Sequence, residues 1–175
     1  MSIVHVAVAM LFAGCVMGDP VNVIEEDARL DGNAAHIAST YQQYALVNAA
    51  PYASGLGAFD INVFVSSEAA AEYKKIDPAN TGSNVVLPPG SAIVRAVLND
   101  DKTVAKLTMM VKGVPGYDPS LGDWWFSVTD THGNPIPDDS GKPQMGRLEA
   151  CHSCHIPREA DDYLFGTPAS TKAHS

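Results

Sequence analysis

The chain has 175 residues, of which 46% are hydrophobic and 18% are charged, which fits one globular domain with a sizeable core. Asp and Glu number 20 against 11 Lys and Arg, so the formal net charge is −9. An acidic surface repels phosphate backbones and anionic lipid headgroups, which argues against nucleic acid partners and against membrane docking through basic patches.

The chain begins with an expected export signal over residues 1–18, and an acidic connector over 19–33 follows it. The signal is an uncharged apolar run of about sixteen residues, short for a spanning helix but suited to secretion. It ends in Phe12-Ala13-Gly14-Cys15, which resembles a bacterial lipobox and makes Cys15 the expected lipidation site. Cleavage before Cys15 would leave the protein in the periplasm or cell envelope, with the lipid as its only contact with a membrane. Two alternatives to lipidation stay open: an ordinary cleaved secretion signal in which Cys15 is incidental, and an amino-terminal segment that is retained.

A single domain is expected over residues 34–168, with a tail over 169–175. Apolar residues at helical spacing predict a helix over Ala34–Ala50, which Pro51 would end. Alternation predicts a strand over Asp60–Ser66, and a short helix is expected over Glu68–Lys75.

Three further strands are expected in the second half of the domain, over Ser91–Leu98, Val104–Lys112 and Asp123–Thr129. The first two are joined by a hairpin turn, and Asp130–Met145 is expected to be a polar loop. Four strands with short connections predict a mainly β, α+β fold, with an antiparallel sheet and helices at its start and end. Most aromatic residues are expected in the core, namely Tyr41, Phe59, Phe64, Trp124, Trp125 and Phe126.

The chemistry-bearing motif lies near the end of this domain. The three cysteines are Cys15, Cys151 and Cys154, which is too few for a disulfide framework. Residues 151–155 read Cys-x-x-Cys-His. In this pattern two thiols can add to the vinyl groups of one haem, and His155 can ligate the iron. The motif therefore predicts one covalent haem c per chain.

Three other uses of the motif stay open. A zinc site would need further ligands from among His36, His132, His152 and His174. A thioredoxin-like redox pair would belong at the start of a helix in a βαβ unit. A disulfide between Cys151 and Cys154 would be strained and would leave His155 without a role.

The sixth coordination position of such a haem has no obvious protein ligand. No Met follows His155, and the one downstream candidate, His174, lies next to the end of the chain. Met109, Met110 and Met145 lie upstream and are expected in the core or in loops. We therefore expect a five-coordinate iron whose open face binds NO, CO, peroxide or a related small ligand.

Several segments also match one family in sequence, order and spacing. They are Leu87–Val94, Val111–Pro119, Gly122–Val128 and Glu149–His155, with Asp162–Phe165 after them. Over about residues 41–165 the chain resembles the cytochrome P-460 and cytochrome c′-beta family of mono-haem c-type cytochromes. The resemblance implies a mostly antiparallel β fold, a single covalent haem near the C-terminus and, often, a homodimer.

On this resemblance, Cys151 and Cys154 match the thioether cysteines and His155 matches the proximal ligand. In members that oxidise hydroxylamine, a lysine on the strand after a Pro-x-Gly turn cross-links to the haem. Arg95 stands at the matching position, and a guanidinium is too poor a nucleophile for that bond. Lys106 and Lys112 lie on the next expected strand, out of register with the position of the cross-linking lysine.

Arg95 has three open roles. It can pair with a haem propionate, donate a hydrogen bond to a bound ligand, or be a solvated strand residue. Arg147 is the other basic residue expected near the propionates.

The sequence thus predicts an exported mono-haem cytochrome that binds NO or a related nitrogen-oxide ligand and exchanges electrons with a redox partner protein. The alternatives are a hydroxylamine- or NO-oxidising haem enzyme, a simple periplasmic electron carrier, and a haem-free β domain.

Overall fold

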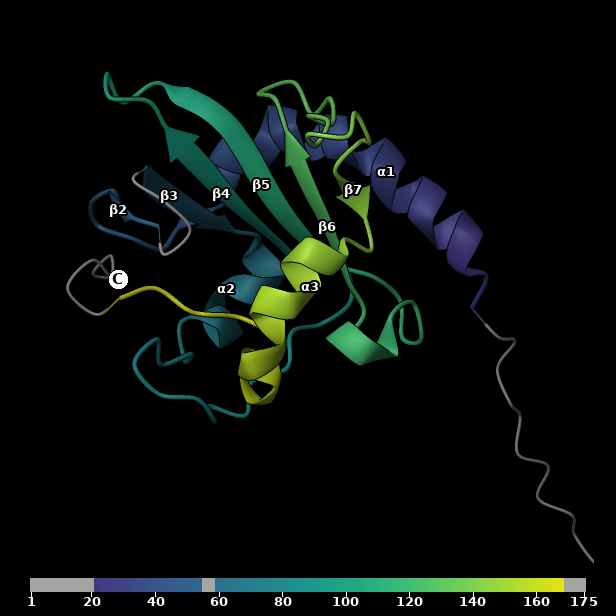
Figure 1. The fold of residues 1–175 in the computed structure, drawn as a ribbon. Helices are drawn as coiled ribbons and strands as arrows, with labels where there is room; N and C mark the ends of the chain where they lie inside the picture. The colour runs from purple at the N-terminus through teal and green to yellow at the C-terminus, as the bar shows by residue number, and fades with distance from the viewer. Residues whose placement is uncertain (1–20, 55–58, 169–175) are drawn as a thin grey trace, which may run out of the picture.

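The fold is α+β, with an antiparallel sheet at its centre. A computed structural model describes residues 21–54 and 59–168. Within these residues the sheet has seven strands: β1 (Ala45–Leu46), β2 (Tyr52–Ala53), β3 (Asp60–Val65), β4 (Ala92–Leu98), β5 (Val104–Lys112), β6 (Trp124–Thr129) and β7 (Met145–Gly146). The strand order is β1-β3-β4-β5-β6-β7, and β2 also pairs with β3 (Figure 1).

The four expected strands are confirmed as β3 to β6, each within one residue of its expected bounds. The three remaining strands have two residues each. A two-residue strand is too short to carry an alternating pattern, so the sequence contains no signal for it. The polar segment after β6 also differs from expectation, because its end forms β7 and pairs with β6.

The first helix lies earlier in the chain than expected. Helix α1 spans Val23–Thr40, and Asn22 caps it by accepting a hydrogen bond from the backbone N–H of Glu25. Residues 23–33, expected as an acidic connector, are therefore the first turns of α1, and Leu30 among them is fully buried. The expected continuation to Ala50 is wrong. That stretch holds a 3-10 turn, η1 (Tyr41–Gln43), followed by β1.

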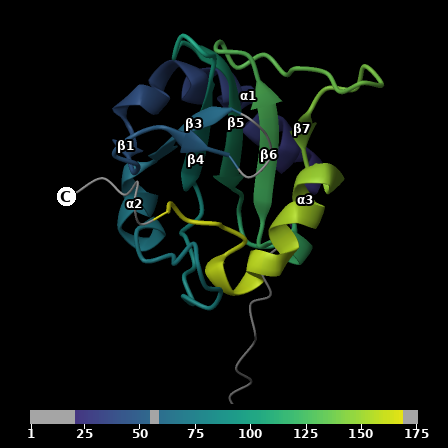
Figure 2. The ribbon, with the colours of Figure 1, turned by 60° about the vertical axis from the view of Figure 1, so that its left-hand side comes forward.

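The sheet separates two hydrophobic clusters. On β4, Ala92, Val94 and Ala96 belong to the cluster that packs with α1. Ile93 belongs to the cluster on the opposite face. That second face is covered by α2 (Ser67–Tyr73), by α3 (Glu149–His155) with the following 3-10 helix η3 (Ile156–Asp161), and by the C-terminal segment (Figure 2). A short 3-10 helix, η2 (Pro119–Leu121), precedes β6.

Most of the expected core aromatics are buried. Trp124 and Trp125 are fully buried and belong to opposite clusters. Phe59 is an exception, because 56% of it is exposed. In the described part of the chain, none of the helices has the length and apolar character needed to cross a bilayer.

Candidate functional site

The Cys-x-x-Cys-His motif forms a short helix against the second face of the sheet. It makes up most of α3, and Leu148 occupies the N-cap position. Cys151 and His155 are four residues apart and share one side of the helix. Cys151 is half-buried and packs against the core, and burial raises the pKa of its thiol. Cys154 is exposed.

The imidazole of His155 is held in one orientation by three neighbours. Its Nδ1 lies 2.6 Å from the backbone carbonyl oxygen of Tyr163. Because a carbonyl only accepts, Nδ1 carries the proton and Nε2 keeps a free lone pair. The rings of Phe126 and Phe165 meet the imidazole edge to face, with centroids 5.4 Å and 5.1 Å away. Burial lowers the pKa of His155 more than the Tyr163 carbonyl raises it, which favours the neutral ring.

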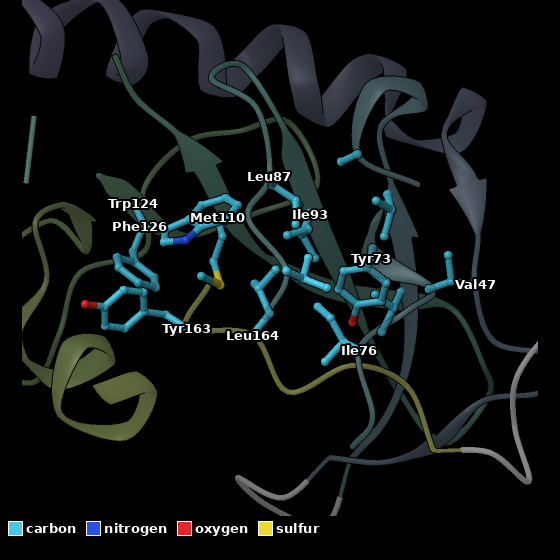
Figure 3. Close-up of a cluster of buried hydrophobic side chains, with 14 of the residues drawn as sticks. Val47, Tyr73, Ile76, Leu87, Ile93, Met110, Trp124, Phe126, Tyr163 and Leu164 are labelled. Atoms are coloured by element: carbon cyan, nitrogen blue, oxygen red, sulfur yellow. The ribbon is translucent and has the colours of Figure 1, made fainter. Parts of the chain in front are cut away.

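His155 lines a cavity of about 480 Å³ between the sheet, α3 and the C-terminal segment. Strands β2 to β5 line one side of this cavity, and α3 with the chain that follows it lines the other. The lining is mostly apolar, with Ile61, Val63, Ile93, Met110 and Leu164 among its members. Figure 3 shows Met110, Phe126 and Tyr163 at the end of the buried cluster nearer to α3, with Tyr73 and Ile76 at the other end.

Arg95 brings positive charge into this apolar cavity. It is half-buried on β4, lines the cavity and donates a hydrogen bond to the Ser54 hydroxyl. Among the described lining residues it is the single Arg or Lys. Tyr52 and Tyr73 line the same cavity, and burial raises the pKa of both hydroxyls. Both therefore stay protonated at neutral pH and can donate hydrogen bonds.

Three of the residues singled out from the sequence thus meet at one cavity: Cys154, His155 and Arg95. Cys151 lies on the same helix with its side chain against the core. Arg147 does not reach the cavity, because it contacts Asp27 at 3.4 Å and the ring of Tyr117. The expected lipidation site, Cys15, lies outside the described residues.

The lysines considered as substitutes for a cross-linking lysine do not reach the cavity. Lys112 is buried in an ion pair with Asp162, and neither Lys106 nor Lys112 is among the described lining residues. Met110, expected only in the core or a loop, lines the cavity. Met109 and Met145 belong to the cluster on the opposite face of the sheet.

The geometry bears on two alternative uses of the motif. Within residues 21–54 and 59–168, no group of three or more His, Cys, Asp and Glu side chains is arranged to hold a metal ion, whereas zinc sites in proteins use three or four such ligands. The sheet in these residues is antiparallel throughout, so the motif does not follow a strand of a βαβ unit.

Sequence reasoning missed Tyr52, Tyr73, Tyr163 and Met110 as parts of the site. Tyr52 lies on a two-residue strand and Tyr163 contributes only its backbone carbonyl, neither of which leaves a sequence signal. Met110 faces the same side of the sheet as its cross-strand partners Ile93 and Phe126, whereas parity along β5 alone groups it with the polar residues Lys106 and Thr108.

Comparison with known proteins adds no family to this geometry: no family model matches the chain, and none of the curated proteins is significantly similar to it.

Proposed function

We propose that the protein is an exported mono-haem c-type cytochrome of the P-460 and c′-beta type that binds NO or a related small ligand. Cys151 and Cys154 would hold the haem through thioethers, and His155 would ligate the iron. The observation that carries the proposal is the state of His155, with Nδ1–H bonded to the Tyr163 carbonyl and a free lone pair on Nε2, beside an apolar cavity. Iron-ligating histidines have this arrangement in metalloproteins.

The cavity residues are compatible with a haem. Pockets for small molecules and cofactors measure about 300–1,000 Å³ and are largely apolar with few polar groups, and the cavity here, of about 480 Å³, has that character. The two thiols lie on one helix with the ligand histidine, and Arg95 supplies a cation for a propionate or an anionic ligand. The haem would supply an iron that binds diatomic ligands and changes oxidation state.

The chain's own residues would exclude water and fix the ligand geometry. Phe126 and Phe165 flank His155 and oppose its rotation. The protonated hydroxyls of Tyr52 and Tyr73 and the guanidinium of Arg95 are donors that can reach an acceptor in the cavity. Because these donors are neutral or cationic, they favour a ligand with partial negative charge.

The test is export of the full chain in a bacterium with a c-type haem maturation system, followed by intact mass and absorption spectroscopy. We expect one haem per chain with both thiols of the motif consumed, a high-spin ferric spectrum, and a ferrous spectrum that changes on addition of NO. The Cys151→Ala, Cys154→Ala double variant should carry no covalent haem. A wild-type chain without haem would overturn the proposal.

A simple electron carrier is the second candidate, because Met110 lines the same cavity as His155. A methionine thioether is the usual sixth ligand in electron-transfer cytochromes c. The Met110→Leu variant separates the two candidates, with Met109→Leu on the opposite face of the sheet as control. A low-spin wild type that becomes high-spin only in Met110→Leu would establish the carrier. Identical high-spin spectra would support the open site.

A further inference from the structure

The acceptor of the His155 hydrogen bond lies in an unusual backbone segment. Asp162 and Tyr163 both have positive φ values, 55° and 64°. Consecutive left-handed residues other than glycine are disfavoured by contacts of their Cβ atoms. Such a conformation persists only where its surroundings impose it. The Tyr163 carbonyl therefore meets Nδ1 of His155 because other contacts hold this pair of residues in place.

Those contacts converge on Asp162. Its Oδ1 lies 2.5 Å from Nζ of Lys112, and its Oδ2 accepts from the backbone N–H of Leu87 at 2.8 Å. Its backbone carbonyl accepts from Nε1 of Trp124 at 2.9 Å. The segment that carries the Tyr163 carbonyl is thus fastened to the ends of β5 and β6 and to the loop before β4.

The ion pair is buried to a degree that a purely stabilising role does not explain. The side chains of Lys112 and Asp162 are 8% and 5% exposed. Removing two charges from water is costly, and a buried ion pair often stabilises a fold no better than apolar groups of similar volume. What the pair supplies is a fixed distance and direction between β5 and residue 162.

We propose that Lys112 and Asp162 are positioning residues for His155: they hold the Tyr163 carbonyl on Nδ1 and thereby set the basicity of Nε2. The hydrogen bond that a metal-ligating histidine donates through its other nitrogen fixes ring orientation and raises ligand basicity. The part of this inference that concerns iron rests on the proposed function, whereas the part that concerns the imidazole does not.

The test uses the matured haem protein and three variants: Asp162→Asn, Lys112→Met and the double variant. Asn tolerates left-handed backbone and its side-chain oxygen can still accept from Leu87, so Asp162→Asn removes chiefly the charge. Asp60→Asn is the matched control, because it breaks the exposed pair between Asp60 and Lys102, which lies at 2.7 Å. The measurement is the iron–histidine stretching band of the ferrous protein in resonance Raman spectra.

We expect the band to move to lower frequency in both single variants and to stay unchanged in Asp60→Asn. An unchanged band in folded Asp162→Asn and Lys112→Met proteins would overturn the proposal. The double variant removes both members of the ion pair and so leaves no unpaired charge. If this variant does not fold, the ion pair is a requirement of the fold, and the proposal is overturned.

A haem-free wild type would refute the proposed function and leave this inference testable in the same chain. Nitrogen-15 NMR of the histidine side chains then reports the tautomer of His155. We expect the Nδ1–H form to dominate in the wild type and in Asp60→Asn and to lose population in Asp162→Asn. Equal populations in all three proteins would overturn the inference.

Discussion

Phe126 and His155 meet edge to face across the gap between the sheet and α3, with ring centroids 5.4 Å apart and planes at 63°. Phe126 comes from β6 and His155 from the end of the motif helix. The contact thus links strand β6 of the sheet to the histidine of the Cys-x-x-Cys-His motif. Orientation of the imidazole is therefore coupled to the packing of the sheet.

Phe126→Ala should destabilise the fold strongly, whereas Phe165→Ala should not. Phe126 is 3% exposed and its truncation leaves a cavity, which costs about 3–5 kcal/mol. Phe165 also touches His155 but is 48% exposed, so we expect a loss of about 1 kcal/mol or less. Urea denaturation gives both free energies of unfolding. Equal losses in the two variants would contradict the assigned burial.

On the proposed function, Arg95→Gln distinguishes a contact of the guanidinium with the bound ligand from a contact with a haem propionate. If Arg95 faces the bound ligand, cyanide affinity should fall by about ten- to hundredfold, the value of a charge-assisted hydrogen bond. Affinity for neutral CO should change little. Lys102→Gln, which removes an exposed cation paired with Asp60, is the control. A change in reduction potential with unchanged cyanide affinity would assign Arg95 to a propionate instead.

Glu26→Gln should flatten the acid branch of the stability profile. The hydrogen bonds from Arg29, with a smaller contribution from the backbone N–H of Val114, lower the pKa of Glu26. A carboxyl with a lowered folded-state pKa stabilises the fold above its unfolded pKa and loses this contribution as pH falls through the folded one. We expect Glu26→Gln to lose about 1–2 kcal/mol at pH 7 and progressively less toward pH 3. Urea denaturation at both pH values measures the difference, and a loss that does not depend on pH would contradict this explanation.

Gly133→Ala should disturb the packing of α1 on the loop after β6. Gly133 has φ +87°, and a Cβ there would lie 2.5 Å from Cα of Ala35. Gly141, with φ +83° and nothing within 4 Å of a Cβ, is the matched control. Gly141→Ala should cost about 1 kcal/mol for its backbone conformation alone, and Gly133→Ala about 2 kcal/mol more for the clash. Thermal denaturation of the two variants compares them, and equal midpoints would refute the close approach.

The parts of the fold that follow from sequence are those with a repeating pattern. The alternation of Ile61, Val63 and Val65 in β3 indicates both the strand and its buried face, because the strand is long enough for the pattern to repeat. The start of α1 is harder to predict, because its first turns are rich in Glu and Asp, which is typical of a solvated linker. Leu30, Ala34, Ile37 and Ala38 nevertheless recur at helical spacing and are all buried, so the repeat that begins at Leu30 is the sequence signal for the earlier start.

The candidate site could be predicted only in part. The spacing of Cys151, Cys154 and His155 is sufficient by itself to indicate the motif. The face of Arg95 could not be decided from sequence, because residues of the same parity on its strand include both apolar and polar types. The role of Asp162 leaves no sequence signal, since two adjacent acidic residues normally indicate a solvated surface, and its partners Lys112 and Leu87 lie far away along the chain.

Every strand of the sheet described here ends before the motif begins, because β7 closes at Gly146 and α3 starts at Glu149. Because the chain crosses the membrane amino-terminal end first on the proposed function, all of these strands become available for pairing on the far side before the thiols of Cys151 and Cys154 arrive there. On the same proposal, the enzymes of haem attachment would meet the motif before it docks, together with the residues that follow it, on an already assembled sheet. Attachment of the haem and docking of α3 over the cavity would then be a single step.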